Sequence, residues 1–305
     1  MIVAIARQQI VALRRQRVFV GLLTIMLAMT AAAGVLGYSS HRTIVGVYDQ
    51  ATILLAQRGE PAPANPFRLK PTLSLLSNMV IYVPMIGALL AIVLGHLSIA
   101  DDETSGIGRL LFTRDVGRRT YLAGKLAADA VVLAAILVMS TLVSAVSLWL
   151  VNGGVPSVGE LGRLVAFYAL AWLYLMVFAV IGMLAMLLTG RRPLALLSAM
   201  SAWLVITFVI PQFTSGLRPT ASLNPIVDPV STSKRFFRVT AHARPASIVE
   251  QYKTISAQIL DTAPHESTLH TLVRIAPIAI VLLVSIAVMA ASIGSHDFSK
   301  GASRD

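Results

Sequence analysis

Six long apolar segments constrain the fold of this chain more than any other feature of its sequence. Each is long enough to cross the hydrocarbon core of a bilayer, which takes about 20 apolar residues in a helix. Inside that core every backbone polar group needs an internal partner, so long apolar runs of this kind are expected to be helical. The chain is therefore expected to be an all-α integral membrane protein with a six-helix transmembrane domain over residues 18–293. The predicted spans are residues 18–38, 73–99, 127–151, 164–188, 194–213 and 272–293.

The composition of the chain agrees with this class. Hydrophobic residues make up 56% and charged residues 13%, whereas soluble domains average about 25% charged. The net charge of +11 would suit nucleic acid, but the basic residues are spread over loops and span ends, which suits anionic lipid headgroups. We therefore expect membrane lipid, and no nucleic acid, as a partner. The lack of cysteine excludes disulfides, thiolate metal sites and cysteine nucleophiles.

The longest charged run between two spans, residues 100–125, is the first candidate functional segment. It begins with acidic residues and ends with basic ones, an order that suits a short helix lying under the membrane. Leu110, Leu111 and Phe112 form an apolar cluster among these charges, and such a cluster needs a protein surface to bury it. Gly106 leaves room for close approach of another backbone. The segment therefore predicts docking of a partner protein; the alternative is a solvated loop whose helix rests on lipid.

This segment resembles the intracellular coupling segment of ABC-2 type transporter permeases, in particular the six-span branch that contains the permease of the nitrous-oxide reductase maturation system. The family pattern runs from Glu-x-x-Gly-Thr through a leucine-rich stretch and a Pro to an Arg and a closing Gly-Lys. Ile107 stands where the family often has Thr, and Asp115 where it often has Pro, so the departures concern the shape of the turn. The matching residues are Glu103, Gly106, Leu110, Leu111, Arg118, Gly124 and Lys125.

The resemblance implies a permease subunit that forms a homodimer and works with two copies of a separate ABC ATPase subunit, which would bind ATP and Mg. This chain has no G-x-x-x-x-G-K-[ST] phosphate loop, so we expect it to have no ATPase activity and no cofactor of its own. The family association also implies an exporter in a bacterial inner membrane, with a cytoplasmic coupling helix between spans two and three. The ATPase-coupling residues carried over are Glu103, Gly106, Leu110, Leu111, Phe112 and Arg118.

The two ends of the chain are expected on the cytoplasmic side. Residues 1–17 combine apolar residues at helical spacing with several arginines, which predicts an amphipathic helix at the membrane interface. Short basic segments at residues 14–17, 118–119 and 191–192 all fall on one side of a six-span topology. The positive-inside rule therefore places both termini, including a tail at residues 294–305, in the cytoplasm.

The loop before the last span, residues 214–271, is expected outside and is the second candidate functional region. Ile248, Tyr252, Ile255 and Ile259 fall at helical spacing and predict a helix within it. The resemblance implies that this loop builds the outer gate of an exporter. The alternative is a non-transporting scaffold or signalling anchor that binds an extracytoplasmic partner through the same loop.

The first outside loop, residues 39–71, also contains a periodic apolar stripe, which predicts a separate short helix at the outer face. The second span contains Pro84 and Gly87, which permit a kink. The residues of the stripe are Ile44, Val47, Tyr48, Ala51 and Leu55.

Polar residues within the spans are few. The middles of the spans carry almost no charge, which argues against a proton- or ion-coupled transporter. Asp129 and His96, near the inner ends of their spans, are expected at the interface. His265 and His270 are five residues apart and so miss the shared helix face of an H-E-x-x-H site, and no metal site is expected. Candidate path or gate residues, with interhelical packing as their alternative role, are Asn78, Thr207, Pro211 and Gln212.

Overall fold

The computed structural model of the chain describes residues 1–15, 17–61, 72–104, 117–152, 154–214, 239–264 and 267–294. These residues form helices and turns, with no β-strand among them. Within this part of the chain, six helical stretches are long and apolar enough to cross a membrane. The protein is therefore an all-helical, multi-pass membrane protein, as its apolar segments predict.

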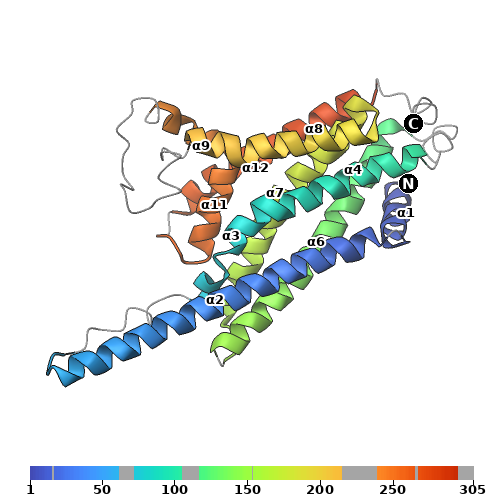
Figure 1. Cartoon of the computed structure of the whole chain (residues 1–305). Helices are drawn as coiled ribbons and strands as arrows, with labels where there is room; N and C mark the ends of the chain where they lie inside the picture. Colours follow the sequence, from blue (N-terminus) through green and yellow to red (C-terminus); the bar gives the residue numbers. More distant parts are fainter. Residues whose placement is uncertain are drawn as a thin grey trace.

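The N-terminal helix α1 (Ile2–Arg15) is followed by a much longer helix, α2 (Val18–Gln57). Arg17 separates the two, because its φ of 57° lies in the left-handed region. Helix α2 has 40 residues, which makes it about 60 Å long, or twice the thickness of the hydrocarbon core. Its C-terminal half consequently projects beyond the body of the molecule (Figure 1).

The prediction of a separate outer helix after the first span is wrong, because the single helix α2 contains both the span and the apolar stripe at residues 44–55. No proline interrupts residues 18–57. The hydroxyls of Thr30, Thr43 and Thr52 each donate to the backbone carbonyl four residues earlier, an arrangement that keeps polar side chains within a helix. Nothing in this stretch therefore forces the helix to end at residue 38.

The second span is built from four consecutive elements. The kink permitted by Pro84 takes the form of a π-helical turn, because proline has no N–H to donate to the regular helical pattern. The indole of Trp203 donates to the Pro84 carbonyl at 3.1 Å. The elements are η1 (Thr72–Leu76), α3 (Met79–Tyr82), the π turn η2 (Val83–Gly87) and α4 (Ala88–Thr104).

The third and fourth spans are α6 (Arg118–Asn152) and α7 (Val158–Thr189). A capping box starts α7, in which Ser157 and Glu160 exchange hydrogen bonds between side chain and backbone. Gly190, with φ of 60°, ends it. Helix α7 is the most buried of the six spans, and it contacts α4, α6 and the helices of the C-terminal half. It is therefore the centre of the bundle.

The C-terminal half supplies the last two spans and the helix between them. Helix α11 is the helix expected before the last span, and its residues Ile248, Tyr252 and Ile255 are buried against α7 and α12. The elements are α8 (Arg192–Leu204), the π turn η3 (Val205–Val209), α9 (Ile210–Thr214), η4 (Ala241–Ala246), α11 (Ile248–Ile259) and α12 (Thr268–Ser292).

The helices extend past the predicted spans, most of all at the end of the first, and the third begins at residue 118 and not at 127. The predicted coupling segment, residues 100–125, is therefore divided. Residues 100–104 end α4 and residues 118–125 begin α6. Residues 105–116, between these two ends, lie outside the described residues.

Two glycines bring α4 and α7 into close contact. A Cβ atom at Gly95 would lie 1.9 Å from the carbonyl oxygen of Ala179, and one at Gly182 would lie 2.3 Å from that of Ile92. Small residues permit this approach of backbones between membrane helices. The two glycines therefore set the spacing between the second span and the central helix.

We predict that Gly182→Ala lowers the free energy of unfolding by about 1–3 kcal/mol, because the added methyl group must push α4 away from α7. Gly162→Ala is the matched control on the same helix, since a Cβ there meets nothing within 4 Å and alanine is the better helix former. Unfolding of the purified protein in detergent measures both effects. Equal stability of the two variants would contradict this packing.

Candidate functional site

A buried ion pair joins the C-terminal end of α4 to the N-terminal end of α6, on the two sides of residues 105–116. We call this the inner end of the bundle, because the positive-inside rule predicts that it faces the cytoplasm, and the opposite end the outer end. The Nζ atom of Lys125 lies 2.6 Å from Oδ2 of Asp102, and the two side chains are 3% and 7% exposed. The hydroxyl of Tyr121 donates to the same carboxylate oxygen at 2.9 Å. This contact, the inner ion pair, therefore fixes where the chain leaves the bundle and where it returns.

Helix α1 is held at the same point. The Lys125 ammonium also donates to Oε1 of Gln9 at 2.5 Å, and Gln9 is buried. Next to it, a Cβ atom at Gly124 would lie 2.7 Å from the side chain of Ile5, so α1 packs directly on the backbone of α6. The inner ion pair thus connects three helices, while the position of α1 on a membrane surface stays a prediction.

Two arginines tie further helices to this end of the bundle. Arg192, the first residue of α8, donates to the carbonyl of Ala100 at 2.5 Å and lies 3.2 Å from Oδ1 of Asp101. Arg118, the first residue of α6, donates to the carbonyl oxygens of residues 293 and 294 at 3.1 and 2.5 Å. These bonds connect α4 to α8 and α6 to the end of α12. The two helix ends on either side of residues 105–116 are therefore bonded to other spans as well as to each other.

A second polar contact lies deeper between α4 and α6. Asp129 is fully buried, one turn along α6 from Lys125, and the hydroxyl of Ser98 donates to its Oδ2 at 3.2 Å. His96 is buried as well, at 6% exposed. Both side chains therefore face the interior of the bundle, and their expected position at the membrane interface stays a prediction.

The predicted coupling residues are only partly described. Arg118 is described with its contacts, and the backbone of Glu103 belongs to the last turn of α4. The sequence analysis missed the inner ion pair, although opposite charges at the facing ends of consecutive spans were an available signal. The remaining predicted coupling residues lie outside the described residues, and they are Gly106, Leu110, Leu111 and Phe112.

The predicted path or gate residues occupy different environments at the outer end. Thr207, in the π turn η3, is 6% exposed, and Pro211 is also buried. Asn78, at the start of α3, is half-buried, whereas Gln212 is exposed. Both η3 and α3 contact α11. The structure therefore places the elements that carry Thr207 and Asn78 beside α11, and leaves the Gln212 side chain facing outward.

Helix α11 packs against α7 and η3, and all three elements carry buried hydroxyls near this contact. The rings of Tyr174 and Tyr252 lie 4.7 Å apart between centroids. Tyr174 faces Thr207, and Tyr252 faces Ser256. None of these four hydroxyls completes a hydrogen bond of ordinary geometry with any described residue. Burial raises the pKa of Tyr252 well above its ordinary value, so its phenol stays neutral and the contact is uncharged.

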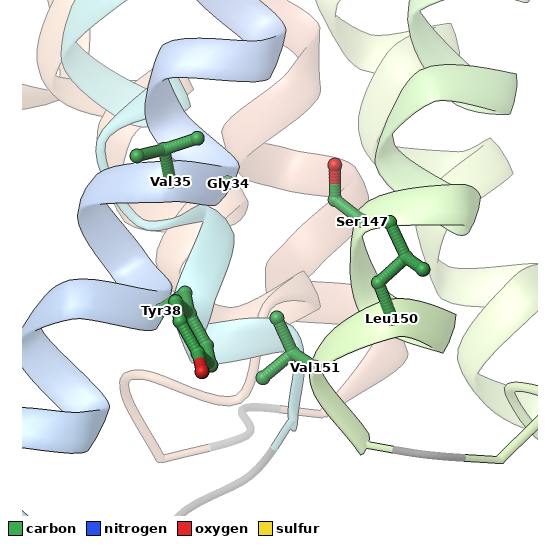
Figure 2. A pocket seen from close by; sticks show the side chains of 6 residues that line it. All are labelled: Gly34, Val35, Tyr38, Ser147, Leu150 and Val151. Atoms are coloured by element: carbon green, nitrogen blue, oxygen red, sulfur yellow. The ribbon is translucent and has the colours of Figure 1, made fainter.

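A cleft of about 190 Å³ lies between the middle of α2 and the C-terminal end of α6. Its lining is almost entirely apolar, and Figure 2 shows the side chains of Tyr38 and Val151 facing each other across it. The hydroxyl of Ser147 donates to the carbonyl of Val143 at 2.9 Å, so the polar atom in the wall has a partner. The cleft offers no set of polar groups for a soluble ligand. Its lining residues are Gly34, Val35, Tyr38, Ser147, Leu150 and Val151.

Comparison with known proteins identifies one family. A sequence model described as ABC-2 family transporter protein matches residues 3–298, which is nearly the whole chain. No curated protein matches the sequence. Among the described residues, no group of three or more histidine, aspartate or glutamate side chains could hold a metal ion.

We predict that Asp102→Asn destabilises the protein by about 3–5 kcal/mol, because it leaves the ammonium of Lys125 buried without its counter-charge. The double variant Asp102→Leu with Lys125→Met should recover much of this loss, since an apolar pair buries no charge. Chemical unfolding in detergent measures both.

Asp101→Asn is the control for this experiment, because Asp101 pairs with Arg192 at the edge of the bundle, where the two side chains are 20% and 37% exposed. Such a partly exposed pair contributes about 1 kcal/mol or less. If Asp102→Asn and Asp101→Asn had the same small effect, the inner ion pair would not be a structural centre.

Proposed function

Because the chain belongs to the ABC-2 family of transporter proteins, we propose that it is the membrane-spanning permease subunit of an ATP-driven transporter. The observation that carries this proposal is the fixed geometry on both sides of residues 105–116. Asp102 and Lys125, whose charged atoms lie 2.6 Å apart, join the two helices that flank the segment. A force on this segment would therefore move α4 and α6 together, which is what coupling to an ATPase requires.

In the proposed complex the ATPase binds residues 105–116 on the cytoplasmic side. Residues 110–112 are apolar side chains in a charged segment, and they would fill a pocket on the partner, because a few buried anchors carry most of the energy of an interface. Glu103 and Arg118 flank these anchors. Gly106 permits close approach of the partner backbone.

The proposed assembly is a permease homodimer with two copies of the ATPase, which bind ATP and Mg, in a bacterial inner membrane. The sequence pattern from Glu103 to Lys125 supports a place in the six-span branch that resembles the nitrous-oxide reductase maturation permease. Helix α1 and the end of α12 both lie at the end of the bundle that carries the inner ion pair. This supports a topology with both termini in the cytoplasm.

At the outer end, α11 would act as a gate of an exporter. It packs over the uncharged hydroxyls of Tyr174 and Thr207, and buried hydroxyls without good partners make a contact less costly to open. ATP-driven closure of the partner would move the coupling segment, tilt the spans built on α2, α4 and α8, and change access at the dimer interface. Export as the direction follows from the family association.

We predict that the double variant Leu111→Ala with Phe112→Ala loses about 2 kcal/mol of association with the ATPase, or about 30-fold in affinity, because it removes the proposed anchors. Co-purification and titration of the ATPase onto the permease in nanodiscs measure this loss. Insertion and dimerisation of the permease should not change, since the spans are untouched.

The matched control is Ile53→Ala with Leu54→Ala, which truncates two adjacent apolar residues, each 59% exposed, at the opposite end of the molecule. It should leave ATPase binding unchanged. Retention of full affinity by the Leu111, Phe112 variant would overturn docking at residues 105–116. Recovery of a stable extracytoplasmic partner, with no ATPase bound to the wild-type chain, would favour the scaffold alternative instead.

A further inference from the structure

Arg118 binds the C-terminal end of the last span. Its Nη1 atom donates to the carbonyl oxygens of Ile293 and Gly294 at 3.1 and 2.5 Å. The last carbonyls of a helix have no partner within the helix, and the helix dipole places partial negative charge on them. A guanidinium group is therefore well suited to hold this end of α12, and its own position is set by the first turn of α6.

The other end of α12 is attached to the proposed gate. Arg274, in the second turn of α12, donates to Oε1 of Gln251 on α11 at 3.4 Å. Gln251 is 2% exposed and also donates to the carbonyl of Arg244 at 2.9 Å, which joins α11 to η4. Helix α12 therefore has a side-chain attachment to α6 at its inner end and to α11 at its outer end.

Between these attachments, α12 is the least embedded of the spans. It is a helix of 25 residues that contains Pro277, about 37 Å long, and only 11% of its most apolar window is buried. By comparison, 67% of the corresponding window of α7 is buried. Its lateral packing is mainly against α7 and α11, and little of the rest of its surface is held by other described helices, so a displacement at one end can reach the other.

We propose that Arg118 is a positioning residue that transmits movement of the coupling segment through α12 to α11. The proposal rests on the permease function proposed above and deepens it by naming the route between the cytoplasmic and outer ends. Only Gly117 separates Arg118 from the segment at residues 105–116, so a movement there would reach the start of α6 through Arg118. Its bonds then displace the end of α12, and Arg274 carries the displacement to Gln251.

The test is hydrogen exchange of the full chain in nanodiscs, read by mass spectrometry at α11, residues 248–259. We expect Arg118→Gln to increase exchange there by about tenfold, because it removes charge-assisted bonds that hold α12. Arg118→Lys keeps a charged donor and should restore part of the protection. Arg119→Gln is the matched control, since it removes the same charge from the next residue, to which the described structure assigns no bond with α12.

A second comparison tests the route itself. In an Arg274→Gln background, Arg118→Gln should add little further exchange at α11, because the attachment at the outer end is already lost. Increased exchange confined to the last turn of α12, with α11 unchanged, would overturn the proposal, as would equal effects of the Arg118 and Arg119 variants. None of these readouts needs the ATPase. If the wild-type chain fails to bind an ATPase, that result contradicts the proposed permease function and not the route through α12. Failure of the function and failure of the route are therefore distinguishable.

Discussion

The buried ion pair between Asp102 and Lys125 is the contact on which the rest of this structure depends. Two charges 2.6 Å apart at the inner end of a membrane bundle are stable only as a pair, because either one alone would be an uncompensated buried charge. The partners lie on the helices that precede and follow residues 105–116. The pair therefore holds together the two helix ends that flank this segment. The hydrogen bond from Lys125 to Gln9 also connects α1 to them.

The inner and outer ends of the bundle differ in how they are held together. The inner end has one buried ion pair and two arginines bound to carbonyls at helix ends, and the central helix α7 packs on α4 through Gly95 and Gly182. At the outer end, α11 rests on aromatic rings and hydroxyls that lack good partners among the described residues. Its ion pair Arg244 to Glu250 is partly exposed at 3.5 Å, and such pairs contribute little. A strongly bonded inner end and a less strongly bonded outer end would suit the proposed drive from the cytoplasm.

The sequence predicted the number and approximate position of the spans, because a bilayer demands long apolar helices and hydropathy reports them directly. It did not predict that α6 starts at Arg118, since a charged stretch such as residues 118–125 looks like a loop until Lys125 is seen to have a buried partner. The outer part of α2 was taken for a separate helix because hydropathy changes at residue 38, whereas the backbone has no proline there to end the helix. Thr207 and Gln212 looked alike in sequence, and only the helix face decides which is buried.

The most direct test of the central claim is a structure of the permease with its ATPase, solved by electron cryomicroscopy without nucleotide and with ADP and vanadate. The account predicts that the ATPase contacts residues 105–116 in both states. It also predicts that Asp102 and Lys125 stay paired while α4 and α6 move together relative to α7, and that α11 shifts. An ATPase bound elsewhere on the chain, or an inner ion pair that breaks between the two states, would contradict it.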